Sequence, residues 1–107
     1  MSTANLTWVN PTTRNDTPPT TLQPSEIASV QIYDAINGAA AVLVGTALPS
    51  SGVPPTSFSW PAVAGTHVVT VTVTDTNGDV SAMSAPVTGT VTQPAPSPAT
   101  GLVLTFS

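Results

Sequence analysis

The stretch Thr66–Asp75, with the sequence THVVTVTVTD, decides the fold that we expect for this chain. Valine and threonine alternate along most of it, so valine side chains point to one face and threonine side chains to the other. This period-two alternation is typical of a β-strand with one buried face. The pair Asn77-Gly78 comes shortly afterwards, and Asn-Gly favours a tight hairpin because both residues tolerate a positive φ. The pattern predicts a long strand that turns back on itself.

Outward from this strand, the same alternation recurs in shorter segments, and no segment spaces its apolar residues helically over more than a turn or two. We expect further strands at Asn5–Asn10, Ile27–Ala35, Ala41–Ala47, Ser57–Trp60 and Val80–Thr92, the last one broken at Pro86. Because proline cannot donate to a strand ladder, Pro11–Pro24 and Pro49–Pro55 are expected to be loops. Six or seven short strands in 107 residues predict an all-β, two-sheet antiparallel sandwich, with a closed barrel as the structural alternative.

The C-terminal region departs from this pattern and divides the chain into three parts. Residues 1–92 are expected to form the sandwich, residues 93–100 a semi-rigid proline-rich linker, and residues 101–107 an extra strand. Leu102, Leu104 and Phe106 share one face of that strand, so leaving it free would expose three large apolar side chains. We therefore expect it to fill a vacant sheet edge, either in its own subunit or by strand addition to a neighbour.

Charge is almost missing from the sequence, which bears on its partners. Arg14 is the only cation, there is no lysine, and the formal net charge is -4. Binding a nucleic-acid backbone or an anionic membrane surface needs several lysines or arginines, so we expect neither partner. The sequence has no cysteine, hence no disulfide or thiolate metal site. We see no signal peptide and no run long enough for a membrane span, and we expect a complete chain.

The alternation also predicts the core and places the single histidine in it. His67 is in phase with the valines of its strand, so we expect it to face inward at the strand end. It could be a ligand or a general base, but we favour a packed, hydrogen-bonded histidine. The residues expected in the core are Leu6, Trp8, Val30, Ile32, Phe58, Trp60, His67, Val69, Val71 and Val73.

The titratable residues do not form a recognisable catalytic pattern. A catalytic triad would need His67 beside a particular serine and a carboxylate, and no nucleophile-elbow motif is found. We expect no enzyme and no cofactor.

The sequence DTNGD gives one weak metal candidate, with Asp75, Asn77 and Asp79 at alternate positions as at the opening of a calcium loop. The bidentate glutamate that completes such a loop is replaced by Pro86. We favour a hairpin turn capped by its own side chains and expect no metal.

Exposed aromatic side chains could bind sugars by stacking, and the chain has five aromatic residues. Trp8, Phe58 and Trp60 are expected in the core, which leaves Tyr33 as the clearly exposed one. A single tyrosine is a weak sugar platform. It could equally anchor a protein interface.

Several of these segments resemble fibronectin type III domains. LTWVNPTTRND, from Leu6, is similar to the second strand and following loop of that family, and IASVQIYDA, from Ile27, to its third strand. AGTHVVTVTVTDTNGDVSAMSAPV, from Ala64, resembles its Gly-Thr-Tyr strand, its turn and its return strand. The likeness covers residues 6–92 and is shared with other bacterial immunoglobulin-like repeats. It implies an immunoglobulin-like, fibronectin type III-like sandwich. His67 stands where the family has tyrosine, and only five residues precede Leu6, where the family's first strand should lie.

The resemblance also implies a class of function. Freestanding domains of this kind without signal peptides are typical of tailed-bacteriophage virions, where they decorate capsids, tails or fibres. We therefore expect a structural virion protein that is made in the host cytoplasm and present in many copies. Its expected partners are a major capsid or tail protein, copies of itself, or both, with Tyr33, Leu102, Leu104 and Phe106 as interface candidates. The alternative is a carbohydrate- or cell-surface-binding module of a secreted bacterial protein.

Overall fold

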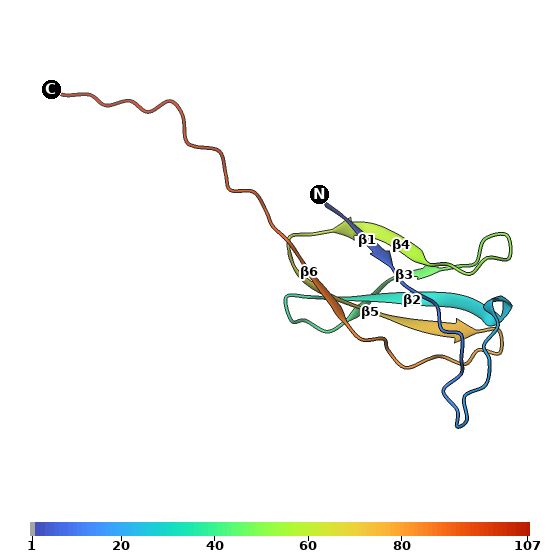
Figure 1. Cartoon of the computed structure of the whole chain (residues 1–107). Coiled ribbons are helices and arrows are strands. Elements are labelled where there is room, and N and C mark those ends of the chain that lie inside the picture. The colour runs from blue at the N-terminus through green and yellow to red at the C-terminus, as the bar shows by residue number, and fades with distance from the viewer. Residues whose placement is uncertain (1) are drawn as a thin grey trace.

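The computed structural model describes residues 2–107, which form two antiparallel β-sheets packed as a sandwich (Figure 1). The elements are β1 (Ser2–Thr7), the short 3-10 helix η1 (Pro24–Glu26), β2 (Ile27–Ile36), β3 (Val42–Ala47), β4 (Ser57–Ala62), β5 (Gly65–Asp75) and β6 (Val87–Val91). The small sheet pairs β1 with β4, and the large sheet has the order β3-β2-β5-β6. The predicted sandwich is confirmed, and the barrel alternative is wrong.

The large sheet is built around β2 and β5, the two longest strands. They pair in an antiparallel register from Ile27↔Asp75 to Ile36↔His67. Beyond β5 the chain turns at the predicted Asn-Gly pair, where the N–H of Gly78 donates to the carbonyl of Asp75 at 3.1 Å. The strand ladder then continues through serines: the N–H of Val73 donates to Ser81 Oγ at 2.9 Å, and that of Val71 donates to Ser84 Oγ at 3.0 Å. Regular pairing begins only after Pro86, with Val87 opposite Val69. The strand expected from Val80 onward is therefore wrong before Pro86, because those residues make only an isolated bridge at Val80.

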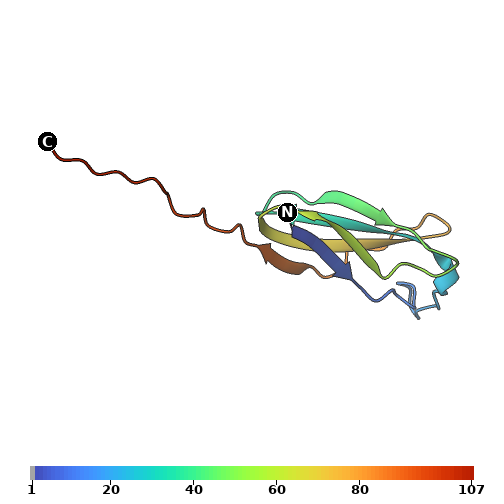
Figure 2. The ribbon, with the colours of Figure 1, turned by 90° about the horizontal axis from the view of Figure 1, so that it is seen from above.

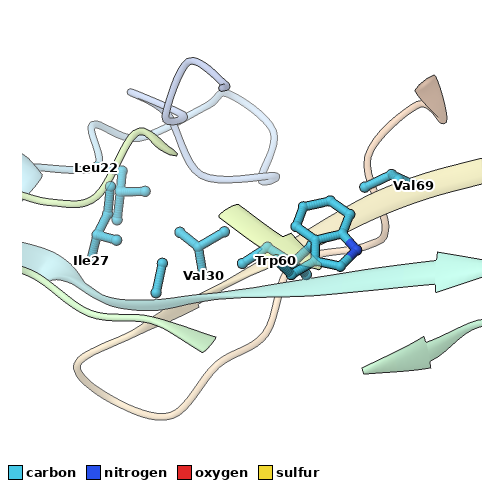
Figure 3. Close-up of a cluster of buried hydrophobic side chains, with 7 residues drawn as sticks. Leu22, Ile27, Val30, Trp60 and Val69 are labelled. Atoms are coloured by element: carbon cyan, nitrogen blue, oxygen red, sulfur yellow. The ribbon is translucent and has the colours of Figure 1, made fainter. Parts of the chain in front are cut away.

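The core lies between the sheets, where Trp60 and Val69 pack at one end of a cluster that continues through Val30 to Ile27 and Leu22 (Figure 3). Trp60 projects from β4 toward the large sheet, where Val30 and Ile32 are fully buried. The predicted core residues divide by depth. Val30, Ile32, Trp60, His67 and Val69 are buried, whereas Leu6, Trp8, Phe58, Val71 and Val73 are partly buried and pack around them.

The first strand corrects a prediction about Trp8. It occupies Ser2–Thr7 rather than Asn5–Asn10, because its register runs from Ser2↔Ala62 to Thr7↔Ser57. Trp8 therefore follows the strand and is only partly buried. Its indole N–H donates to Asn10 Oδ1 at 2.8 Å, so the ring sits at the edge of the core. Trp60, with 8% of its surface exposed, is the tryptophan buried between the sheets.

The C-terminal residues 92–107 leave the sandwich as an extended tail (Figures 1 and 2). They form no strand with any other part of the described chain. Leu102 is 90% exposed, Leu104 79% and Phe106 89%. Pairing of this segment within its own subunit, one of the two expected arrangements, is not found. The single chain leaves these three side chains in solvent.

Candidate functional site

One side of the sandwich is open because the small sheet is narrower than the large one. β4 contacts β3 on one side, but beyond β1 no further strand of the described chain covers β6. The result is a groove of about 280 Å³ between β1 and β6. The groove is lined by residues of both sheets: Ala4, Asn5, Leu6, Trp60, Ala62, His67, Val69 and residues 87–91. The groove therefore gives solvent access to side chains that belong to the core.

Gly89 keeps this groove wide. It pairs with His67, whose side chain faces inward, so a side chain at position 89 would also point between the sheets. A Cβ built there meets no atom within 4 Å. Glycine in the middle of a strand often marks a place where another backbone approaches closely.

His67, one of the groove-lining residues, pairs with Asp34 behind it; the two side chains are buried, with His67 6% and Asp34 2% exposed. His67 Nδ1 lies 2.6 Å from Asp34 Oδ2, and His67 Nε2 lies 2.8 Å from the carbonyl oxygen of Val63. The carbonyl of Val63 can only accept, so Nε2 carries a proton. When Nδ1 donates to the Asp34 carboxylate, both ring nitrogens carry protons and His67 is an imidazolium. The Val63 carbonyl and, next, the Asp34 carboxylate raise the pKa of His67 above its ordinary value.

These hydrogen bonds suit His67 to a structural role rather than to that of a general base. With both nitrogens donating, neither lone pair is free to accept a proton from a substrate. The bond to Val63 also links the strand start to the backbone four residues upstream. The expectation of a packed, hydrogen-bonded histidine agrees with this geometry.

Asp34 was missed as the partner of His67, although the signal was in the sequence. It follows Val30 and Ile32 at the same period-two spacing, so it had to face inward. A buried carboxylate needs a partner, and His67 is the inward-facing group that can donate to it. Trp60 Nε1 also approaches Asp34 Oδ2 at 3.4 Å, whereas Asp34 Oδ1 has no hydrogen-bond partner.

A second polar cluster lies at the opposite end of the sandwich, around Arg14. Its guanidinium donates to Glu26 Oε2 at 2.6 Å and to Asp75 Oδ2 at 2.8 Å. Those carboxylates raise the pKa of Arg14, and Arg14 lowers the pKa of Asp75. The pKa of Glu26 is lowered first by the N–H of Gln23 and then by Arg14. The cluster ties the long loop before β2 to the start of β2 and the end of β5.

The hydrogen bonds of Asp75 also show what the weak metal candidate, Asp75, Asn77 and Asp79, does in the structure. Asp75 Oδ1 accepts the N–H groups of Asn77 and Asp79, both at 2.9 Å, while Asp75 Oδ2 accepts from Arg14. Asp75 is therefore engaged as a turn cap, and Asn77 and Asp79 lie exposed beyond it. Within residues 2–107, no group of three or more histidine, cysteine or acidic side chains could hold a metal ion.

The remaining interface candidates lie far apart. Tyr33 is on the outer face of the large sheet, as its phase predicts, but it is half-buried between Thr70 of β5 and Leu43 of β3. The outer face beside it is polar, since Gln31 Oε1 accepts from the hydroxyls of Thr72 and Thr74 at 2.9 Å. The structure brings neither Tyr33 nor the tail into the groove of the same chain.

Comparison of this chain with protein-family models, with curated proteins and with solved structures finds no match. Among the helices of the described residues, none is long and apolar enough to cross a membrane.

Proposed function

We propose that this chain is a non-enzymatic structural protein that acts through protein–protein contacts, as a decoration or accessory subunit of a tailed-bacteriophage virion. The observation that carries the proposal is the open side of the sandwich together with an apolar tail outside the fold. Natural sheets avoid unpaired edges beside exposed apolar surface unless a partner covers them. Neither feature has an evident use in a chain that stays alone.

The strand order supports the immunoglobulin-like part of the proposal. If β1 is the second strand of the fibronectin-like pattern and β2 its third, then β1–β4 and β2-β5-β6 correspond to the B–E and C-F-G neighbours of that sandwich. His67 takes the place of the corner tyrosine and likewise bonds to the backbone upstream, at Val63. On this assignment the first strand is the one whose place beside β1 is vacant.

The mode of action is passive docking. The sandwich carries a nearly uncharged surface with a single cation, Arg14, which is already neutralised by two carboxylates. Such a surface repels neighbouring copies weakly. Many copies on one lattice would add their weak contacts through avidity.

Particle association tests the proposal. Antibodies against the purified chain should label purified virions from a host that carries its gene, and the chain should sediment with those particles. If the chain is absent from particles and instead binds a defined oligosaccharide on a glycan array, the proposal fails and the carbohydrate-binding alternative replaces it.

A further inference from the structure

We propose that the tail of one copy is the missing edge strand of the next, with Leu102–Phe106 inserted beside β1 into the groove between β1 and β6. This rests on the proposed structural function, because it names the partner that the open side binds. The occupant is a second copy of this chain, and the copies are joined head to tail.

The groove and the tail match in chemistry. Groove-lining Leu6, Trp60 and Val69 are apolar, and the tail offers three apolar side chains on alternate residues. Alternate residues of an added strand point to one face, so all three would enter the gap between the sheets. Residues 92–107 contain no charged side chain, and their insertion would bury no new charge.

The groove also has room for a backbone. The free edge of β1 offers unpaired N–H and C=O groups to an incoming strand, as other sheet edges do in strand addition. Gly89 faces the same gap with open space where its side chain would be. An added strand beside β1 would cover Leu6, which is only partly buried in the single chain.

The direction of the tail selects a neighbour rather than the same chain. The tail leaves from the end of the sandwich where β1 begins, since Ser2, Val91 and Pro94 line one hollow there. A tail folded back onto its own β1 would first have to reverse, and would then run parallel to it. A tail that continues outward can enter a neighbour of the same orientation at the end where the neighbour's β1 finishes, near Thr7. It then runs antiparallel to that neighbour's β1. Antiparallel pairing is the pattern of every other strand pair in the described chain.

The linker suits this arrangement. Pro94, Pro96 and Pro98 hold the segment extended and disfavour a reversal. The ten residues from Thr92 to Gly101 can span about 30 Å at roughly 3.1 Å per residue. That length separates the two sandwiches, so the donated segment can reach the next groove without the sandwiches colliding.

Two variants separate the donor from the recipient. Leu104→Asp places a charge on the inserted face of the tail and leaves the groove intact. Gly89→Phe fills the groove and leaves the tail intact, with Gly89→Leu in reserve if the larger side chain prevents folding. Val103→Asp is the matched control, because it adds the same charge to the opposite face of the same tail. Both tail positions are exposed in the single chain, so neither tail variant should change the melting temperature of the dilute monomer.

The measurement is the mass of each full-length protein by analytical ultracentrifugation over a wide concentration range. The unchanged chain and Val103→Asp should form chains of growing length. Leu104→Asp and Gly89→Phe should each associate at least about tenfold more weakly, since burying one leucine side chain is worth more than a factor of ten. An equimolar mixture of these two variants should form a one-to-one dimer, because one supplies the tail and the other the groove.

Three results would overturn the inference: a monomer at all concentrations, equal loss of association in Val103→Asp and Leu104→Asp, or no dimer in the mixture. Virion association is scored separately with the same variants. If Leu104→Asp still binds virions while self-association never occurs, strand donation is wrong and the structural function stands. If donation occurs but the chain is absent from virions, the virion proposal is wrong and donation stands.

Discussion

Two glycines lie on the two edge strands of the large sheet and face the same gap, and their surroundings are opposite. Gly45 on β3 pairs with Ile32 and faces the core, where a Cβ would collide with the ring of Phe58. Gly89 on β6 pairs with His67 and faces the same gap, where a Cβ would meet nothing. The missing side chain of Gly45 makes room for the ring of Phe58, whereas the missing side chain of Gly89 leaves a groove. One side of this sandwich is packed by its own chain, and the other side is open.

The largest expected effect tests the closed part of the core. Trp60→Ala should lower the free energy of unfolding by about 3–5 kcal/mol, as large aromatic truncations in cores do. Trp8→Ala should cost only about 1–2 kcal/mol, because Trp8 is partly exposed beyond the end of β1. Chemical denaturation of both variants measures the difference. Equal losses would mean that Trp8 belongs to the core as fully as Trp60 does.

The next effect compares the two glycines directly. Gly45→Ala should destabilise the protein by about 1–3 kcal/mol, because the new methyl group overpacks the Phe58 ring. Gly89→Ala should be neutral or stabilising by up to about 1 kcal/mol, because open space and a reduced unfolded-state entropy both favour it. Chemical denaturation of both variants measures the two changes in the free energy of unfolding. Destabilisation of similar size at both positions would show that the β6 side is as tightly packed as the β3 side.

A smaller effect should appear on changing pH, through the buried pair of His67 and Asp34. The pKa of His67 is raised in the folded protein, so its contribution to stability is fully present below its ordinary pKa of 6.5. That contribution is lost as the pH rises through the raised value. Asp16, Glu26 and Asp75 have lowered pKa values, so their contributions stay constant over this range. The melting temperature should therefore fall as the pH rises from 6.5 through the raised pKa of His67, and His67→Gln should abolish this fall. A flat profile in the unchanged chain would contradict the imidazolium assignment.

The last prediction is that calcium has no effect on stability, and it concerns the end of the sandwich where Arg14 binds Glu26 and Asp75. Thermal unfolding in chelator and in millimolar calcium should coincide, because both oxygens of Asp75 already have protein partners. Calcium that binds only the folded state would raise the melting temperature. A rise of several degrees would show that the turn exchanges Arg14 for a metal ion.

The sequence predicted most of the strands because their pattern is local. The alternation of valine and threonine placed β5 correctly, and the Asn-Gly pair placed the turn after it. The burial of Trp8 was not predictable in the same way, because the register of β1 is set by its partner β4 and not by its own residues. The open groove could be predicted only in part. The sequence indicated that a first strand is missing, but the inward position of Gly89 depends on its pairing with β5. Asp34 could have been predicted from its phase, and the Arg14 cluster could not, since it joins a loop to two distant carboxylates.

The Arg14 cluster has a consequence for protease digestion. Trypsin cleaves after lysine or arginine, and this chain offers it one bond, between Arg14 and Asn15. Because the guanidinium is held by Glu26 and Asp75, that bond becomes a substrate only when the loop before β2 comes away from the sandwich. Limited trypsin digestion would therefore report on this single opening motion, with a cut that removes the N-terminal strand β1 and leaves the proline-rich tail intact.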